Sequence, residues 1–304
     1  MSHGRLHRCV WRNRVYRPPP GAAACSKWRD RARCRARSTP GQVTTKSDQA
    51  VEYIQADLLD DVTVGAAIAG TDAVVNLAGI LTETANQTCR AIHVEGARRV
   101  TLAAERHRVM RLIYTSTLGA SSISPAVSDR TMAEGELAVR DVFPQATIVR
   151  PSLVFGEDDH FFSRFAAMIR SSLVLPLIGG GTTKFQPVFV DDMTAGLLDL
   201  LERSDTAGQT LRIGGPQVYS FKALLEFLLT ALSRRRLLIP IPFTLAEMQA
   251  RLLELLPNPP LTRDQVRLLK TDKVVSGAEP TLGDLGVQPR PLEEFLAVFK
   301  DKYR

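Results

Sequence analysis

Cysteine is scarce in this chain, and long apolar runs are missing. Four cysteines occur in 304 residues, and Cys9, Cys25, Cys34 and Cys89 form no CxxC pair. This spacing supports neither a zinc site nor a disulfide framework, so we expect no metal and a reducing compartment. No apolar run reaches the roughly 18 residues of a membrane-spanning helix. The N-terminus also lacks the apolar stretch of a secretory leader, which makes the cytoplasm the default expectation.

Acidic residues are nearly absent from the first 37 positions. This segment holds ten Arg, one Lys and one Asp, about +10 in all, and leaves about −3 for the remainder of a chain whose net charge is +7. Such asymmetry is typical of a basic arm for nucleic acid or of a mitochondrial transit peptide. However, Pro18–Pro20 would break a transit helix, and the segment lacks the interleaved aromatics of a base-stacking platform. We therefore expect no nucleic-acid partner.

Strand-like and helix-like patterns alternate from residue 50 onward. Short runs rich in β-branched residues predict strands, and apolar residues at helical spacing predict the helices between them. The expected strands are Val51–Ala56, Asp72–Ala78, Arg111–Ser116 and Ala146–Val154, and the expected helices are Val62–Ala69, Ala85–His107 and Arg130–Val142. This order predicts an α/β fold with a doubly wound parallel sheet, Rossmann-like, whose ligands bind beyond the carboxyl ends of the strands.

The alternation loosens after Gly156 into helices and proline-rich turns. We expect three regions along the chain. They are an aberrant and disordered basic segment at 1–45, an NAD(P)-binding Rossmann-like domain at 46–215, and a smaller C-terminal helical lobe at 216–304.

Within the expected lobe, Leu237–Leu256 is dense in leucine and follows Arg234–Arg236. It could lie on an anionic membrane or dock on a partner. A buried helix is the favoured interpretation, because Glu247 and Glu254 provide only a modest polar face.

Several short motifs occur in the order and spacing of a known superfamily. They are Asp57-Leu58 after a strand, Asn76–Gly79, His93–Arg98, Tyr114–Ser116 and Arg150–Gly156. Together they resemble the atypical and extended short-chain dehydrogenase/reductase superfamily, which includes NAD-dependent epimerases and dehydratases. Phe185–Asp192, Ile213–Pro216 and Leu261–Lys270 are similar to its branch of nucleotide-binding accessory subunits of respiratory complex I. The resemblance implies an NAD(P)(H) cofactor.

The resemblance also implies roles for individual residues. Asp57 would accept the adenine amino group, with Leu58 packed beside the ring, and Leu77, Ala78 and Gly79 would line the adenosine ribose. Ser116 would lie near the nicotinamide and is the one candidate catalytic residue, while Pro151, Ser152 and Val154 would flank the carboxamide. An Asp after a strand is also an ordinary turn former, so only the ordered set favours cofactor contacts over local structure.

The catalytic pair of that superfamily is missing. A Tyr and a Lys four residues later perform its proton transfer, and the alignment on Arg130-Thr131 and Gly135-Glu136 places Ser128 and Met132 there. Serine has no accessible pKa, and methionine has neither charge nor donor. We therefore expect the superfamily's hydride chemistry to be lost, and cofactor binding to persist in weakened form.

The glycine-rich turn that binds the pyrophosphate is missing too, because Gly4, Gly21 and Gly41 are wrongly spaced. We hypothesise that about residues 7–37 are translated out of frame. Reading one nucleotide downstream, Trp11 must give Gly, and the string GGTGFIG becomes readable across Trp11–Arg17. As printed, the sheet would lack its first strand and this turn. An Arg readable after the second strand favours NADP weakly.

Three functions remain open from the sequence. The leading one is a non-catalytic or catalytically altered NAD(P)(H)-binding protein with a structural or assembly role, either cytoplasmic or attached to the inner membrane through a membrane-complex partner. The second is an active NAD(P)-dependent oxidoreductase, epimerase or dehydratase in which Asp129, Glu134 or a water near Ser116 substitutes for the missing pair. A nucleic-acid-binding protein is the third, and it rests on the basic N-terminus alone.

Overall fold

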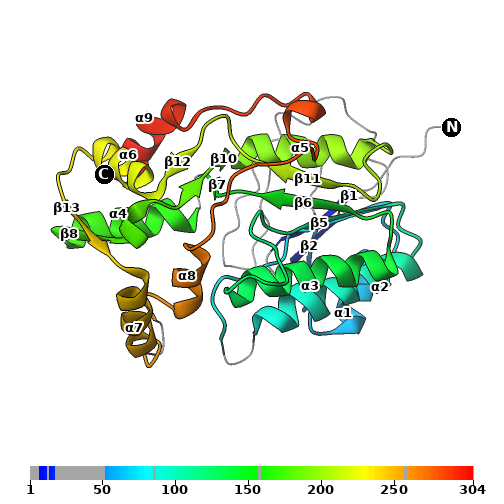
Figure 1. Cartoon of the computed structure of the whole chain (residues 1–304). Helices are drawn as coiled ribbons and strands as arrows, with labels where there is room; N and C mark the ends of the chain where they lie inside the picture. The colour runs from blue at the N-terminus through cyan, green and yellow to red at the C-terminus, as the bar shows by residue number, and fades with distance from the viewer. Residues whose placement is uncertain are drawn as a thin grey trace. The chain divides into compact units, whose positions relative to one another are not determined.

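A seven-stranded sheet carries the α/β part of the chain in the computed structural model (Figure 1). The structure describes residues 7–11, 14–17, 52–84, 87–156, 159–256 and 259–303. The strands are β1 (His7–Trp11), β2 (Arg14–Arg17), β3 (Glu52–Gln55), β4 (Ala73–Asn76), β5 (Arg111–Thr115), β6 (Thr147–Pro151) and β11 (Thr210–Ile213). Their order in the sheet is β11-β6-β5-β4-β1-β2-β3. Strands β1, β4 and β5 run parallel, which confirms the predicted Rossmann-like α/β fold.

The expectation that the first strand is missing is wrong. β1 pairs in parallel with β4, from His7 opposite Ala73 to Val10 opposite Asn76. Strand pairing uses backbone N–H and C=O groups, so a segment containing Cys, Val and Trp can take this place. β2 then returns antiparallel to β1 and pairs antiparallel with β3. Because two residues separate β1 from β2, no helix can follow the first strand there, and the rest of the segment expected at 1–45 lies outside the described residues.

Helices cover both faces of this sheet (Figure 1). On one face lie α1 (Asp61–Ile68), α2 (Ala97–Arg106) and α3 (Val127–Val142), and on the other lies α5 (Val190–Glu202). A sheet covered on both faces needs apolar residues on successive strand positions, and all four residues of β4 are indeed buried. The helix expected over Ala85–His107 is a π-helical segment, η2 (Ala91–Gly96), that runs directly into α2.

The chain divides into two compact units that interleave in sequence. The first contains residues 1–115, 134–148 and 197–209, and the second contains residues 116–133, 149–196 and 210–304. Residues 116–133 and 149–196 therefore group with the C-terminal part of the chain. Independent folding of the expected domain over 46–215 and lobe over 216–304 stays a prediction.

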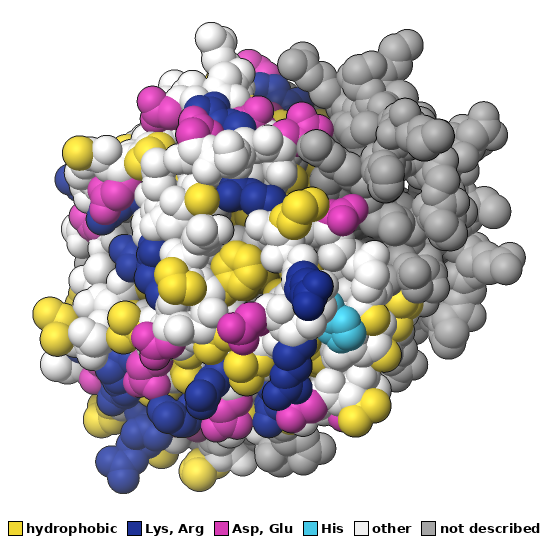
Figure 2. Space-filling model, turned by 90° about the vertical axis from the view of Figure 1, so that its right-hand side faces the viewer, with side chains coloured by type: hydrophobic (Ala, Val, Ile, Leu, Met, Phe, Trp, Pro, Cys, Tyr) yellow, Lys and Arg dark blue, Asp and Glu magenta, His cyan; other side chains and the backbone are white. Residues whose placement is uncertain are grey.

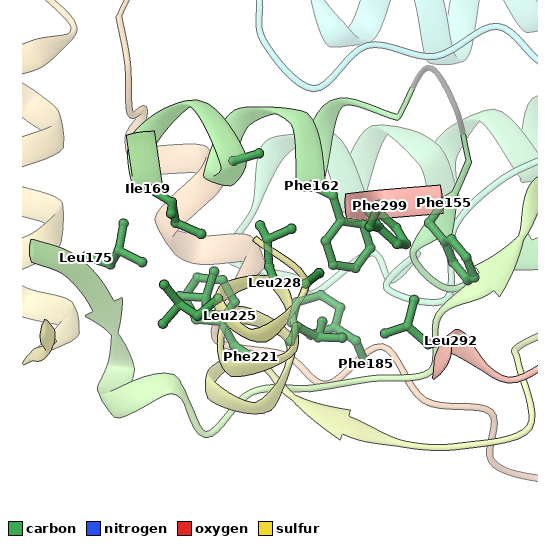
Figure 3. Close-up of a cluster of buried hydrophobic side chains, with 14 of the residues drawn as sticks. Phe155, Phe162, Ile169, Leu175, Phe185, Phe221, Leu225, Leu228, Leu292 and Phe299 are labelled. Carbon is green, nitrogen blue, oxygen red and sulfur yellow. The ribbon is translucent and has the colours of Figure 1, made fainter. Parts of the chain in front are cut away.

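The second unit is built around an aromatic core (Figure 3). Phe162 and Phe299 meet edge to face with ring centroids 4.7 Å apart, and Phe155 packs in the same way on Phe295. The core lies between α4 (His160–Ser171), α6 (Phe221–Ala231), η5 (Leu292–Phe295) and α9 (Leu296–Tyr303). Strand pairs β7 (Val154–Phe155) with β10 (Val188–Phe189), and β9 (Lys184–Phe185) with β12 (Tyr219–Ser220), connect these helices.

One expectation for this unit is wrong. Leu237–Leu256 comprises a strand, β13 (Leu237–Ile241), paired in parallel with β8 (Val174–Ile178), and then α7 (Phe243–Leu253). The sequence predicts a buried α7, but only Ala246 and Ala250 are buried among its residues. Glu247 and Glu254 face the neighbouring α8 (Arg263–Leu268), and Leu245 and Leu252 of α7 are exposed to solvent instead. No helix in the described ranges is long and apolar enough to cross a bilayer.

Candidate functional site

In the first unit, the predicted adenosine residues follow the carboxyl ends of β3 and β4. Asp57 is exposed, and its Oδ1 accepts a hydrogen bond of 2.9 Å from the backbone N–H of Leu59. This Asx turn leads into α1. The helix begins after Asp60, and the Asp60 carboxylate caps it by accepting a hydrogen bond from Val62 N–H. Leu58 is buried close to Gly96 of η2. Asp57 is thus a turn former with an exposed carboxylate, and both of its proposed roles remain compatible with this geometry.

The loop after β4 is held by two side chains. Asn76 is buried, and its Oδ1 accepts from the backbone N–H of Ala78 at 3.0 Å. The N–H of Ile80 donates to His93 Nε2 at 3.0 Å, which requires that nitrogen to be unprotonated. Ala78 is buried, whereas Gly79 is exposed and Leu77 half-buried. The backbone of Leu77–Gly79 is therefore fixed at the sheet edge where ligands bind in open α/β folds.

Tyr114 on β5 contacts His93, the residue that binds this loop. Its hydroxyl donates to the backbone oxygen of His93 at 3.1 Å. Burial, together with the charge of Glu136, raises the pKa of the Tyr114 phenol well above its usual range. A Cβ at Gly135 would lie 2.1 Å from that same carbonyl oxygen, so α3 approaches η2 as closely as it does because position 135 carries no side chain. Tyr114 is therefore a structural phenol with no proton to exchange near neutral pH.

In the second unit, two of the candidate residues have buried hydroxyls without partners. Ser116 donates its backbone N–H to Val149 O at 2.7 Å, but its Oγ has no hydrogen-bond partner among the described residues. The same holds for Ser128 Oγ at the start of α3. A buried unpaired hydroxyl costs about 1–3 kcal/mol, so such groups in a native structure call for an explanation. A ligand oxygen is one group that would satisfy them.

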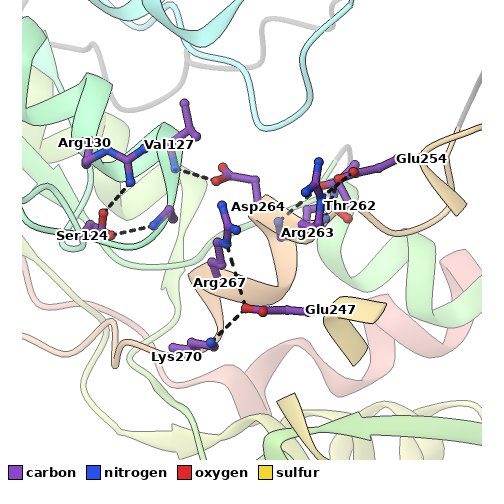
Figure 4. A network of polar contacts seen from close by, with 12 residues as sticks. Ser124, Val127, Arg130, Glu247, Glu254, Thr262, Arg263, Asp264, Arg267 and Lys270 are labelled. Atoms are coloured by element: carbon purple, nitrogen blue, oxygen red, sulfur yellow. Dashed lines mark hydrogen bonds and ion pairs between the residues drawn. The ribbon is translucent and has the colours of Figure 1, made fainter. Parts of the chain in front are cut away.

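The start of α3 is capped from α8, a contact that no motif in the sequence indicates. Both carboxylate oxygens of Asp264 accept from this helix, at 2.5 Å from Val127 N–H and at 3.1 Å from Ser128 N–H. Figure 4 shows this carboxylate reaching Val127, next to the hydrogen bond from Arg130 to Ser124 O. A carboxylate at a helix N-terminus satisfies unpaired N–H groups and interacts favourably with the helix dipole.

Next to Ser128, Asp129 holds a lysine from far along the chain. Lys273 Nζ donates to Asp129 Oδ2 at 2.6 Å, and the side chains are 10% and 2% exposed. Ser124 Oγ is a second donor to the same oxygen at 3.4 Å. A Cβ at Gly119 would lie 1.7 Å from the ammonium nitrogen, so a larger residue there would displace the ends of the Lys273 and Asp129 side chains. A cation therefore stands beside α3 although Met132, the expected lysine position, supplies none.

Ser152 connects three segments of the second unit. Its Oγ donates to Lys273 O at 2.6 Å and accepts from Gln186 N–H at 3.0 Å. The amide of Gln186 in turn donates to Gly215 O and accepts from Val275 N–H. Ser152 thus fixes the backbone that carries Lys273, a role that sequence reasoning missed. Pro151 is buried at the end of β6, and Val154 is half-buried in β7.

An NAD(P) cofactor fits these residues only in part. In the first unit, the fixed backbone and small residues after β4 suit an adenosine. In the second unit, taken by itself, the unpaired Ser116 hydroxyl suits a polar ligand atom. Among the described residues, β1 is followed by β2 and not by a helix whose N-terminus would hold a pyrophosphate. Within the described ranges, no group of three His, Cys, Asp or Glu side chains could hold a metal ion.

Comparisons with known proteins agree on one family. A family model described as NAD(P)H-binding matches residues 28–153. NADH dehydrogenase (ubiquinone) 1 alpha subcomplex subunit 9, a mitochondrial protein, is 33% identical in Arabidopsis thaliana over 259 residues, which cover 82% of this chain and 64% of the relative. The same protein in Dictyostelium discoideum is 30% identical over 254 residues, covering 83% and 70%. The chain thus spans a little under two thirds of the Arabidopsis relative's length.

Solved structures share the fold. A dTDP-glucose 4,6-dehydratase from Streptomyces venezuelae, solved with NAD bound, matches with a TM-score of 0.61 at 19% identity and covers 82% of this chain and 78% of its own. A nucleoside-diphosphate-sugar epimerase from Staphylococcus aureus matches with a TM-score of 0.58 at 17% identity, covering 79% and 81%. At such identities the likeness is one of fold alone.

Proposed function

Because the chain belongs to the NAD(P)H-binding, atypical short-chain dehydrogenase/reductase family, we propose that it is a nucleotide-binding accessory protein and not a reductase. One observation carries this proposal. Ser128 and Met132 lie one turn apart on α3, at the positions where the resemblance places the catalytic Tyr and Lys. Neither side chain can donate or accept a catalytic proton near neutral pH.

The partner we propose is an NADH dehydrogenase complex of the membrane, with the chain attached at its periphery. The support is the name of the relatives, which are subunits of such a dehydrogenase, over 82% of this chain. In this role the bound nucleotide would stabilise the fold. A binder of the native state raises the unfolding free energy without any chemistry.

The test is to mix the purified full chain with NADH or NADPH and to follow the fluorescence of the reduced cofactor. Binding should enhance it, while carbonyl compounds and nucleotide sugars should cause no loss of the reduced cofactor's absorbance. Substrate-dependent loss would contradict the accessory role. Ser128→Tyr with Met132→Lys should restore reductase activity only where the remaining site is intact, and Ser128→Phe with Met132→Lys is the control that lacks the phenol hydroxyl.

A second function, NAD(P)-dependent oxidoreductase, epimerase or dehydratase chemistry, is favoured by the unpaired hydroxyls of Ser116 and Ser128. Asp129 is a poor substitute base, because Lys273 already neutralises it. Turnover that Ser116→Ala abolishes, with nucleotide binding unchanged, would favour this function over the first. Nucleic-acid binding rests on the basic N-terminal sequence alone. On the face seen in Figure 2, the described basic and acidic side chains are interspersed.

We also propose a cofactor type, which depends on the hypothesis that the N-terminal segment is translated out of frame. NADP is weakly favoured over NAD by the Arg that the shifted frame makes readable. The location we propose is the cytoplasm, with peripheral attachment to the inner membrane, because the spacing of the four cysteines supports no disulfide framework.

A further inference from the structure

Helix α7 has two opposite apolar faces. The inner face places Ala246 and Ala250 in a buried cluster with Ile178 and Val266. On the opposite side, Leu245, Met248 and Leu252 are exposed, and Leu255 and Leu256 continue the same stripe in the turn that follows. An amphipathic helix of a soluble protein normally exposes polar residues there, so this outer stripe lacks a cover among the described residues.

The acidic side chains of this segment point away from the outer stripe. Glu247 pairs with Lys270 at 2.8 Å, and Glu254 pairs with Arg263 at 2.7 Å, both on or just after α8 (Figure 4). These hydrogen bonds and charges lower the pKa of Glu247 below its usual range. They are the only acids in residues 233–256, so the outer side is left without negative charge.

The ribbon of β8 and β13 continues the apolar surface. Its inner face packs Leu175 and Leu238 into the aromatic core. On its outer face Leu237 stands opposite Val174, and both are exposed, as is Ile239 two positions on. Figure 1 shows this ribbon leading directly into α7.

Basic residues border this surface. Arg234 and Arg235 are exposed immediately before β13, and Arg251 is exposed on α7 beside Leu252. The segment 233–256 therefore presents exposed aliphatic side chains and cations, and its two acids are neutralised on the other side. We define the outer surface by Leu237, Ile239, Leu245, Met248, Leu252 and Leu255, with these three arginines at its border.

We propose that the outer surface binds an anionic lipid bilayer, with the leucines inserted at the headgroup boundary and the arginines on lipid phosphates. Exposed aliphatic patches of this kind mark interaction sites. Protein interfaces are enriched in aromatic anchors, which the outer surface lacks, whereas an apolar face bordered by Arg suits interfacial binding to anionic lipids. The inference rests on the peripheral attachment proposed above. It adds which surface of the chain contacts the membrane and which class of lipid that surface binds.

The test is flotation of the full chain with vesicles of phosphatidylcholine alone or with phosphatidylglycerol and cardiolipin added. Leu252→Gln with Leu255→Gln should weaken binding to the anionic vesicles about tenfold or more. The matched control is Leu137→Gln with Ile123→Gln, since Leu137 (61%) and Ile123 (91%) are as exposed as Leu252 (65%) and Leu255 (83%) but lie elsewhere. The control should bind like the unmodified chain, and thermal unfolding should show all variants folded.

Charge is tested separately. Arg234→Gln with Arg235→Gln should weaken binding roughly tenfold and reduce its salt dependence, whereas Arg98→Gln with Arg106→Gln should not. Binding that all variants share would overturn the assigned surface and leave peripheral attachment standing. No binding of the unmodified chain to any vesicle would overturn the lipid proposal, as would a concentration-dependent dimer that the leucine variant abolishes, which would assign the surface to a second copy. Nucleotide fluorescence on the same samples reports on the accessory function independently.

Discussion

Lys273 and Asp129 meet at 2.6 Å, nearly buried, although 144 residues separate them in sequence. The ammonium lies against Gly119, and the backbone of Lys273 is held by Ser152 and Gln186. The start of α3 is thus joined to the segment after α8 by this ion pair and to α8 itself by the Asp264 cap. An ion pair in this position couples α3 to the C-terminal part of its unit.

Removing one partner of this pair should be costly. Lys273→Met leaves the Asp129 carboxylate buried with Ser124 as its remaining donor in the described structure, and such uncompensated charges cost about 3–5 kcal/mol. The double variant Lys273→Met with Asp129→Leu should recover much of that loss. Urea unfolding measures both effects. Lys222→Met, which removes an exposed pair to Glu226, is the control and should change the unfolding free energy by less than about 1 kcal/mol. A Lys273→Met loss no larger than the control's would show that the pair is not buried in solution.

Two helix glycines should respond oppositely to alanine. Gly135→Ala places a Cβ against His93 O and the Tyr114 hydroxyl, so α3 must shift, and we expect a loss of about 1–3 kcal/mol. Gly65→Ala in α1 meets nothing closer than 4.0 Å and should stabilise the chain by about 0.5–1 kcal/mol through helix propensity. Thermal and urea unfolding of the two variants provide the measurement. A stabilising Gly135→Ala would contradict the close approach of α3 to η2.

Tyr114 should make the fold sensitive to alkali. Its pKa is raised in the native state, so this group contributes stability below the usual tyrosine pKa of about 10 and loses it as the pH rises toward the native value. Above about pH 10 the unfolding free energy should fall by up to about 1.4 kcal/mol per pH unit. Tyr114→Phe should make that slope shallower, leaving the part due to Tyr219, whose pKa burial and Glu293 also raise. It should cost about 1 kcal/mol at neutral pH through the lost bond to His93 O. Equal slopes in both chains would mean that the phenol ionises in the native state.

Much of the sheet could be predicted because its strands are local patterns. Ala73–Asn76 and Arg111–Thr115 are short, β-branched or apolar runs, and the sequence predicts both within a few residues. β13 escapes prediction because Pro240 and Pro242 are typical turn residues, yet proline is tolerated in a two-stranded ribbon that lacks a second neighbour. β1 escapes it because no glycines follow the strand.

The parts of the candidate site that form local sequence motifs could be predicted, but the contacts between residues far apart in sequence could not. The strand-end residues from Asp57 to Ser116 follow from motifs, and the absence of Tyr and Lys on α3 follows in the same way. Asp264 and Lys273 do not, because each acts on α3 from more than 130 residues away. A single sequence contains no pattern that predicts contacts between such distant residues. For the same reason, the contact of Glu247 with α8 could not be predicted.

The pyrophosphate site provides the decisive prediction about the N-terminus. We expect the nucleotide sequence across codons 5–45 to encode GGTGFIG in the shifted frame. A chain restored to that frame should bind NADPH at least about a hundredfold more tightly than the printed chain, because two charge-assisted hydrogen bonds to phosphate contribute about 1.5–3 kcal/mol each. Isothermal titration of both chains measures the difference, and a restored chain with valine at the middle glycine of the turn is the control. If no frame encodes the motif, the hairpin of β1 and β2 is the native structure, and nucleotide binding must rely on the strand-end residues alone.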